Sequence, residues 1–588
     1  MNTYYTDEKN TQIVIGLLKA HGIKKVVASP GTTNIRLVAS MQQDSWFEIY
    51  SSADERSAAY IACGMAAKSG EPVVLSCTGA TASRNYFPGL TEAYYRKLPV
   101  LAITSTQHHG RVGQNVAQVL DRSVQPRDTV KLSVELGTCY SEEDEWFCNV
   151  QANRAILELK RNGGGPVHIN LETTYSTNFS VEKLPPVYPI YRIGMMDKFP
   201  KLPEGRIGIF VGEHIPFSEE ETNLIEKFCR KYNAVVLCDQ TSNYRGANRV
   251  LFSLTTSQDY HYFAGNDFRL IIYIGNISGA YPNLPSASEW RVNPDGEIRD
   301  IFKHMKYVFE MEETSFFSAY TNFDEELDIL NVRTEFKKEW DAEYENLYKQ
   351  IPELPFSNIW VAKNTASKLP GNADLHLGIL NSLRSWNFFE TPESVEVYCN
   401  TGGFGIDGIL STAIGNSLVD PDRLVFVAIG DLAFFYDMNS LGNHHLGKNL
   451  RILFINNGRG TEFRNFNHPG AQFGEDADAY IAAADHYGRM SKNLVQHYAK
   501  DLGLKYMSAE NKEEYFNQLD DFLNSDVITE SVIFEVFTNW EDESNALEKI
   551  RSVQIDTAEL KKREMKNKLR NVIGDKRYNA IKHFVKRS

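Results

Sequence analysis

The stretch that decides the fold is Ala428–Gly460, AIGDLAFFYDMNSLGNHHLGKNLRILFINNGRG. The stretch contains the end of one apolar segment, RLVFVAIG, and the whole of a second, LRILFI. Each segment has the length and composition of a strand buried on both faces. Asp431 follows the first segment, and Asn457 follows the second, 26 residues later. In a parallel sheet both strands end at the same edge, which is where ligands bind. The histidine pair His444-His445 between them is expected within a helix, in a structural role.

Oxygen ligands gathered at one sheet edge favour a hard divalent cation. The Asp431 carboxylate, the Asn457 amide and the backbone carbonyl of Arg459 would form such a set for Mg²⁺ holding a diphosphate. Flanking glycines let the backbone approach phosphate closely. The stretch therefore predicts a magnesium–diphosphate site.

Apolar strands alternate with helical stretches in three parts of the chain, and helices are expected over 54–70 and 83–97. The predicted fold class is α/β, with three consecutive parallel-sheet domains and a basic helical tail. The domains are expected at 1–183, 205–345 and 358–545, with a proline-rich linker at 184–204 and the tail at 546–588. In the middle domain, the acidic turn VGEHIPFSEEE replaces a Gly-x-Gly-x-x-Gly turn, which argues against bound NAD or FAD.

Composition narrows the class of protein. The 588 residues carry a formal net charge of −14, which argues against a general nucleic-acid binder because phosphate binding needs a basic surface. The N-terminus lacks signal-peptide features, and no apolar run reaches the ~18 residues of a membrane helix. The seven cysteines are scattered, as expected of thiols in a reducing compartment. We expect a cytoplasmic protein.

The C-terminal segment 559–588 has eleven lysines and arginines against three acidic residues. Five apolar residues could share one helical face: Leu560, Met565, Leu569, Val572 and Ile573. We expect this tail to pack on its own protein or a partner. Docking on an anionic surface is the alternative.

Gly-Asp followed by Asn-Asn at this spacing resembles the motif of thiamine diphosphate enzymes. The order of the three domains resembles their pyrimidine-binding, central and diphosphate-binding domains, over about residues 1–545. A second match is YSSADERSAAYIACGMA, Tyr50–Ala66. The resemblance implies that Glu55 hydrogen-bonds N1′ of the cofactor's aminopyrimidine. It also implies a homodimer or homotetramer with active sites at subunit interfaces.

Other cofactor-binding residues are implied by the same resemblance. The loops SPGT and CTGATASRNY resemble those that cradle the pyrimidine, and TGGFGIDG resembles the stretch that supports the bent cofactor through Ile406. The expected cofactor-binding residues, besides Asp431 and Asn457, are Pro30, Gly31, Thr32, Thr78, Gly79, Asn85, Gly402, Gly403, Phe404, Ile406, Gly430, Leu432 and Ala433.

Within that family the motifs are most similar to those of the menaquinone-pathway synthases, which join a unit derived from 2-oxoglutarate to isochorismate. The arginines that hold carboxylates in those enzymes are replaced here by Thr33, Thr401 and the segment Gln107–His109. These replacements favour a less anionic acceptor, such as a keto sugar.

The stretch STQHHGRVGQN follows the strand LPVLAIT. Its pair His108-His109 resembles the proton-moving pair of the pyruvate decarboxylase branch, and Gln118 resembles the glutamine that acetolactate synthases place over the cofactor. Imidazole donates and accepts protons near neutrality. The residues expected to be catalytic are therefore Glu55, His108, His109 and Gln118.

The predicted function is thiamine diphosphate- and Mg²⁺-dependent decarboxylation of a 2-oxo acid, with transfer of the acyl carbanion to an acceptor carbonyl. Alternatives are a decarboxylase that releases an aldehyde, a thiamine-dependent diketone hydrolase, an FAD- or NAD-dependent oxidoreductase, and a catalytically silent paralogue with an assembly role. The expected partners are small molecules and a second copy of the chain, not nucleic acid.

Overall fold

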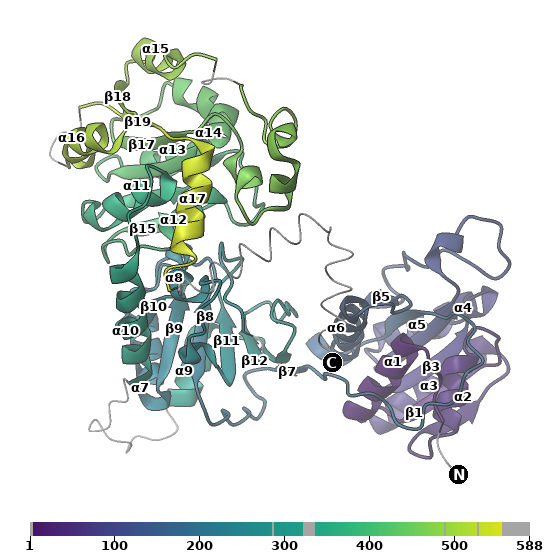
Figure 1. The fold of residues 1–588 in the computed structure, drawn as a ribbon. Helices are drawn as coiled ribbons and strands as arrows, with labels where there is room; N and C mark the ends of the chain where they lie inside the picture. Colours follow the sequence, from purple (N-terminus) through teal and green to yellow (C-terminus); the bar gives the residue numbers. More distant parts are fainter. Residues whose placement is uncertain (1–3, 285–286, 322–334, 487–489, 526–528, 555–588) are drawn as a thin grey trace, which may run out of the picture. The chain divides into compact units, whose positions relative to one another are not determined.

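The computed structural model describes residues 4–284, 287–321, 335–486, 490–525 and 529–554 (Figure 1). The predicted tail from residue 555 onward, including its apolar face, lies outside them. The chain divides into two compact units, residues 1–201 with 288–312 and residues 202–287 with 313–588. No helix in the described part of the chain is both long enough and apolar enough to cross a membrane.

The first sheet is parallel and has six strands in the order β2-β1-β3-β4-β6-β5. Its strands are β1 (Lys25–Ala28), β2 (Glu48–Ser51), β3 (Val73–Thr78), β4 (Val100–Thr106), β5 (Ser133–Leu136) and β6 (Val167–Glu172). Its helices are α1 (Lys9–Ala20), α2 (Ile35–Gln42), α3 (Glu55–Ser69), α4 (Thr81–Asn85), α5 (Phe87–Tyr95) and α6 (Glu142–Glu158). Neighbouring strand residues face opposite cores: Val26 packs with α1, α2 and α6, and Val27 packs with α3 and α5.

The second sheet has seven strands in the order β10-β9-β8-β11-β12-β13-β7. Its strands are β7 (Tyr191–Ile193), β8 (Ile207–Val211), β9 (Ala234–Cys238), β10 (Arg249–Leu251), β11 (Leu270–Ile274), β12 (Ser288–Val292) and β13 (Met305–Phe309). The accompanying helices are α7 (Glu219–Tyr232), α8 (Ser253–Thr256), α9 (Glu313–Thr321) and α10 (Glu335–Gln350). Strand β7 lies inside the proline-rich segment 184–204 and pairs with β13.

The third sheet is parallel, with the order β15-β14-β16-β17-β19-β18. Its strands are β14 (Asp374–Leu377), β15 (Glu396–Tyr398), β16 (Val425–Gly430), β17 (Leu450–Asn456), β18 (Lys505–Ala509) and β19 (Val532–Phe537). Its helices are α11 (Asn358–Thr365), α12 (Asn381–Trp386), α13 (Ile409–Val419), α14 (Asp431–Asp437), α15 (Leu494–Asp501), α16 (Lys512–Leu523) and α17 (Trp540–Ile550). The predicted α/β class with three parallel sheets is confirmed.

Two local predictions were wrong. The helix expected over 83–97 is interrupted at Tyr86, because Pro88 in the first turn of α5 has no N–H to continue the α4 ladder. His444 and His445 lie in a turn rather than a helix. The side chain of Asn443 accepts the backbone N–H of His445, a local bond that competes with helix formation.

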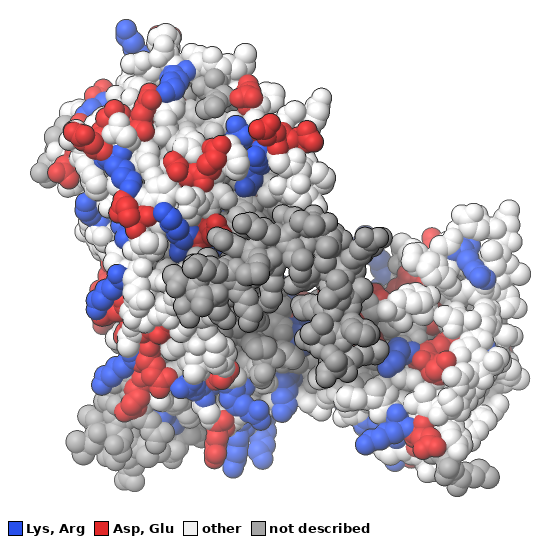
Figure 2. All heavy atoms as spheres, in the orientation of Figure 1, with Lys and Arg blue, Asp and Glu red and all other residues white. Residues whose placement is uncertain are grey.

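Figure 2 shows acidic and basic side chains interspersed on the described surface of one face. On the described part of this face, neither sign of charge is gathered into a separate patch.

Candidate functional site

Asp431 lies at the carboxyl edge of the third sheet, as the first residue of α14 directly after β16. Its Oδ2 accepts the backbone N–H groups of Asn457 (3.2 Å), Gly458 (2.5 Å) and Arg459 (3.1 Å), which form the turn after β17. Its Oδ1 accepts the N–H of Leu432 at 2.7 Å. The two strand ends lie at one edge, as the sequence predicts, and the carboxylate of Asp431 joins them.

Burial raises the pKa of Asp431 to about 6, against the opposing effect of the four backbone N–H groups. Beside it, the Oδ1 atom of Asn457 accepts the hydroxyl of Thr461 at 2.5 Å. A carboxylate, an amide oxygen and the carbonyl of Arg459 are the oxygen ligands that suit Mg²⁺. These three residues could hold that ion.

The glycines at this edge leave room for a ligand. A Cβ built on Gly402, Gly403 or Gly430 would meet no protein atom within 4 Å. Phe404 follows them with a left-handed backbone, φ 53°, and is 42% exposed. Ile406 is half-buried and packs against the apolar cores on both faces of the third sheet.

Two further residues predicted at this edge belong to α14. Ala433 is buried in the core beneath the sheet edge, and Leu432 is half-buried. Ala433 therefore contributes to the packing of this core.

Glu55 is the first residue of α3 in the first unit. The preceding residue, Asp54, caps the helix by accepting the N–H of Arg56 at 3.0 Å. Asn85, at the end of α4, donates from Nδ2 to Oε2 of Glu55 at 3.4 Å. Two residues predicted from separate motifs thus lie in contact, through Oε2 of Glu55.

The loop after β1 approaches the end of β3 closely. A Cβ on Gly31 would lie 2.5 Å from Cβ of Thr78, and one on Gly79 would lie 2.5 Å from the carbonyl oxygen of Ser105. Neither position accommodates a larger residue without a backbone shift. Pro30 and Thr32, on either side of Gly31, are exposed.

Thr33 is 1% exposed and joins the ends of β3 and β4. Its hydroxyl donates to the carbonyl of Ser105 at 2.8 Å, lies 2.7 Å from the hydroxyl of Thr78 and accepts the N–H of Gly79 at 3.2 Å. Thr401, the second replacement, is 3% exposed. The Thr33 side chain is therefore engaged with the protein itself, and Thr401 is buried.

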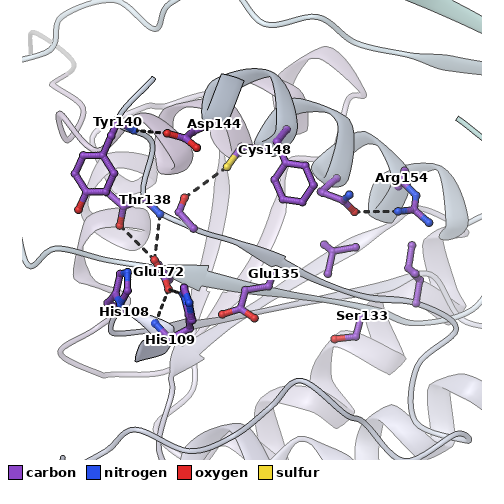
Figure 3. Close-up of a pocket in the computed structure, with 15 residues that line it drawn as sticks. His108, His109, Ser133, Glu135, Thr138, Tyr140, Asp144, Cys148, Arg154 and Glu172 are labelled. Carbon is purple, nitrogen blue, oxygen red and sulfur yellow. Dashed lines mark hydrogen bonds and ion pairs between the residues drawn. The ribbon is translucent and has the colours of Figure 1, made fainter. Parts of the chain in front are cut away.

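His108 and His109 follow β4 and are exposed (Figure 3). Their rings stack, with centroids 4.5 Å apart. The Nδ1 atom of His108 accepts the N–H of Gly110 at 3.1 Å, and the Nδ1 atom of His109 lies 3.1 Å from Oε1 of Glu172. Gln118, further along the same loop, is exposed and has a left-handed backbone, φ 65°.

Sequence reasoning missed Glu172, which ends β6 and is 2% exposed. Its Oε1 accepts the backbone N–H of His109 at 2.6 Å. Its Oε2 accepts the N–H of Thr138 at 3.1 Å and lies 3.4 Å from that residue's hydroxyl. An acidic residue at the end of a parallel strand next to β4 was the available signal. Ligand atoms of His108, His109 and Glu172 all lie within 4.8 Å of one another.

A cavity of about 720 Å³ opens beside this cluster (Figure 3). Its lining includes the two histidines, Glu172, Thr138, Tyr140 and Cys148, with Arg154 among the remaining residues. In Figure 3 the histidines and Arg154 lie at opposite ends of the pocket.

Arg111 was also missed. Its guanidinium donates to the side chain of Gln107, which is 9% exposed. Both residues line a cavity of about 410 Å³ together with His108, Tyr140 and Tyr175. This loop therefore does contain an arginine. It stands four residues after Gln107, just beyond the segment 107–109 that replaces the arginine of the related enzymes.

The residues around Glu55 and His109 belong to the first unit, and those around Asp431 belong to the second. Each group contains its own part of the predicted machinery: proton-moving side chains in the first, and oxygen ligands for a metal in the second.

Comparison with known proteins identifies the group to which this chain is related. The family described as "Thiamine pyrophosphate enzyme, N-terminal TPP binding domain" matches residues 9–124. A 2-succinyl-5-enolpyruvyl-6-hydroxy-3-cyclohexene-1-carboxylate synthase of Bacteroides fragilis is 33% identical over 569 residues, covering 91% of this chain and 97% of its own. Proteins of the same name from Bacteroides thetaiotaomicron and Phocaeicola vulgatus are each 32% identical, covering 91% and 92% of this chain and 97% and 98% of their own. These matches confirm the resemblance drawn from the motifs, and the chain belongs to the family of thiamine pyrophosphate-dependent enzymes that includes these synthases.

Proposed function

We propose that this protein decarboxylates a 2-oxo acid with thiamine diphosphate and Mg²⁺ and transfers the acyl carbanion to an acceptor carbonyl. The observation that carries the proposal is the arrangement around Asp431, where a buried carboxylate joins the ends of β16 and β17. Membership of a thiamine pyrophosphate-dependent family supports it.

The residues present fit the cofactor. Open space at Gly402, Gly403 and Gly430 suits a diphosphate that approaches the backbone closely. The carboxylate of Asp431 and the amide oxygen of Asn457 suit the Mg²⁺ that neutralises it. When bound, thiamine diphosphate supplies a nucleophilic carbon and an electron sink for decarboxylation.

The chain's own residues would orient the cofactor and move protons. Glu55, held by Asn85, would hold a proton on the aminopyrimidine. His109, positioned by Glu172, would donate or accept a proton at its Nε2 atom. His108 stacks on His109 and would share this role, and Gln118 would contact the bound substrate.

Two acceptor classes follow from different observations. Thr33 and Thr401 are buried where substrate arginines would be expected, which favours a polar acceptor with few carboxylates, such as a keto sugar. Arg111 beside the cavity of about 410 Å³ favours a carboxylated acceptor, as in the relatives, whose name describes a product with a succinyl group and a carboxylate. We favour the first, since two replaced positions are sealed from solvent.

The test is a substrate screen with purified full-length protein, thiamine diphosphate and Mg²⁺. Each 2-oxo acid is supplied alone, with a keto sugar, or with isochorismate, and CO₂ release and products are followed by mass spectrometry. The proposal expects CO₂ release and a ligated product with the keto sugar. An aldehyde alone would identify a simple decarboxylase, and addition of water without CO₂ would identify a hydrolase. No CO₂ from any acid would refute the proposal.

A further inference from the structure

Two cysteine sulfurs face one another near the group formed by His108, His109 and Glu172. Cys139 lies in the segment between β5 and α6, and Cys148 lies in the second turn of α6. Their Sγ atoms are 3.5 Å apart, and the Sγ of Cys148 also lies 3.5 Å from the carbonyl oxygen of Gly137. A disulfide has an S–S distance of about 2.05 Å, so a shift of about 1.5 Å would join them.

The two thiols differ in acidity. The hydrogen bond with Cys148 lowers the pKa of Cys139, although burial and the nearby Glu145 and Asp144 carboxylates oppose the thiolate. The same contact raises the pKa of Cys148. A thiolate is the nucleophile in thiol–disulfide exchange. Cys139 is also the more exposed of the two thiols, so we expect it to attack first and Cys148 to react second.

Other cysteines of the chain provide a contrast. Burial raises the pKa of Cys63 to about 11, of Cys238 to about 12 and of Cys399 to about 12. Cys63 is nearly fully buried and donates to the backbone carbonyl of Gly89. These residues lack the lowered pKa that distinguishes Cys139.

A small reagent can reach the pair. Cys139 is half-buried, and Cys148 lines the cavity of about 720 Å³ shown in Figure 3. The same cavity is lined by Thr138 and Tyr140, the neighbours of Cys139 in the chain. The cavity therefore reaches Cys148 directly, and it also reaches the two chain neighbours of Cys139, whose sulfur lies 3.5 Å from that of Cys148.

We propose that Cys139 and Cys148 form a redox-active dithiol that is oxidised to an intramolecular disulfide by a low-molecular-weight disulfide, RSSR. The Cys139 thiolate attacks one sulfur of RSSR, forming a mixed disulfide and releasing RS⁻. Cys148 then loses its proton, attacks Sγ of Cys139 and releases the second RS⁻. The two departing thiolates take up the two protons lost by the cysteines, so two thiols are oxidised while RSSR is reduced to two RSH.

The dithiol is connected to His109 through Thr138 and two hydrogen bonds to Glu172. Thr138, next to Cys139, donates its N–H to Oε2 of Glu172, and Oε1 of Glu172 accepts the N–H of His109. Closing the bridge draws the segment around Thr138 towards α6, and this loosens the support of His109. Oxidation is therefore expected to slow turnover; this consequence rests on the proposed function, whereas disulfide formation does not.

The thiol chemistry is tested on the full-length protein with glutathione disulfide, followed by alkylation and peptide mass spectrometry. The wild type should lose both thiols as one intramolecular disulfide that dithiothreitol reverses. Cys148→Ser should keep glutathione on Cys139, and Cys139→Ser should leave Cys148 reduced. Cys399→Ser is the matched control and should behave as the wild type. Equal alkylation of Cys139 and Cys63 after oxidation, or a bridge between two chains, would overturn the proposal.

Turnover is measured on the same samples. The oxidised wild type should lose activity by about tenfold to a hundredfold, since a displacement of about 1 Å near reacting groups has effects of that size. Dithiothreitol should restore it, and Cys139→Ser should resist the oxidant. Unchanged turnover despite a formed disulfide would refute the switch. Absence of any turnover before oxidation would refute the proposed function and leave the thiol result standing.

Discussion

Glu55→Gln separates folding from chemistry at the start of α3. Asp54 still caps the helix through the N–H of Arg56, so the variant loses only the interaction of a carboxylate with the helix dipole, about 0.3–1 kcal/mol. The Gln oxygen can still accept from Asn85, whose Nδ2 lies 3.4 Å from Glu55. The proton held by the carboxyl group is lost, and general acid–base catalysis of this kind contributes about 10²- to 10⁴-fold. Turnover should fall by that factor, which is about 3–5 kcal/mol of activation free energy.

The assay compares CO₂ release by the wild type, Glu55→Gln and the control Glu92→Gln at saturating thiamine diphosphate and Mg²⁺. Glu92 is a partly exposed carboxylate on α5 that pairs with Arg96 at 3.2 Å, so its loss should leave turnover unchanged. Thermal unfolding with and without the cofactor verifies that each variant folds and binds. Activity of Glu55→Gln within a few-fold of the wild type would refute the assignment of Glu55.

Three further outcomes are expected. Asp431→Asn should weaken thiamine diphosphate binding at least about tenfold in calorimetry, and chelation of Mg²⁺ should do the same to the wild type, since both remove an oxygen-ligand site. Arg111→Gln should raise KM for a carboxylated substrate about tenfold with little change in kcat, whereas an equal rise for a neutral acceptor would contradict its role. Burial lowers the pKa of His168 to about 3. Below about pH 6.5 the His168 imidazole therefore binds a proton in the unfolded chain but not in the folded one. The free energy of unfolding consequently falls by about 1.4 kcal/mol per pH unit towards pH 3. His168→Gln should flatten the fall in urea midpoint between pH 6.5 and 5, and an unchanged slope would contradict this.

Residues at the ends of long apolar strands were predictable from the sequence. Asp431 and Asn457 follow fully buried segments, so the parallel topology alone places them at one edge. Glu55 was predicted through the resemblance of its motif to those of thiamine diphosphate enzymes, and its contact with Asn85 brings two quoted motifs together.

Strands that are short or polar could not be predicted from the sequence. Strand β5 is Ser-Val-Glu-Leu, and β14 is Asp-Leu-His-Leu with a buried aspartate paired to Arg423, so neither shows an apolar run. Glu172 and Arg111 were missed for another reason: their roles depend on which side chains meet across loops, and chain spacing does not contain that information. The turn at His444 depended on a side-chain bond from Asn443.

Because Thr33 is tightly packed, the substitutions that would change the substrate preference can occur only in a certain order. Thr33 ties the ends of β3 and β4 through Thr78, Gly79 and Ser105. Replacing Thr33 alone with arginine would remove those bonds. The larger side chain would also have to fit into a site that is 1% exposed, which has no room for the additional atoms. A lineage or a laboratory selection that moves towards polycarboxylate substrates must therefore first enlarge the neighbourhood of Thr78. Arg111, already exposed in its loop, is the position at which such a change can begin without a loss of stability.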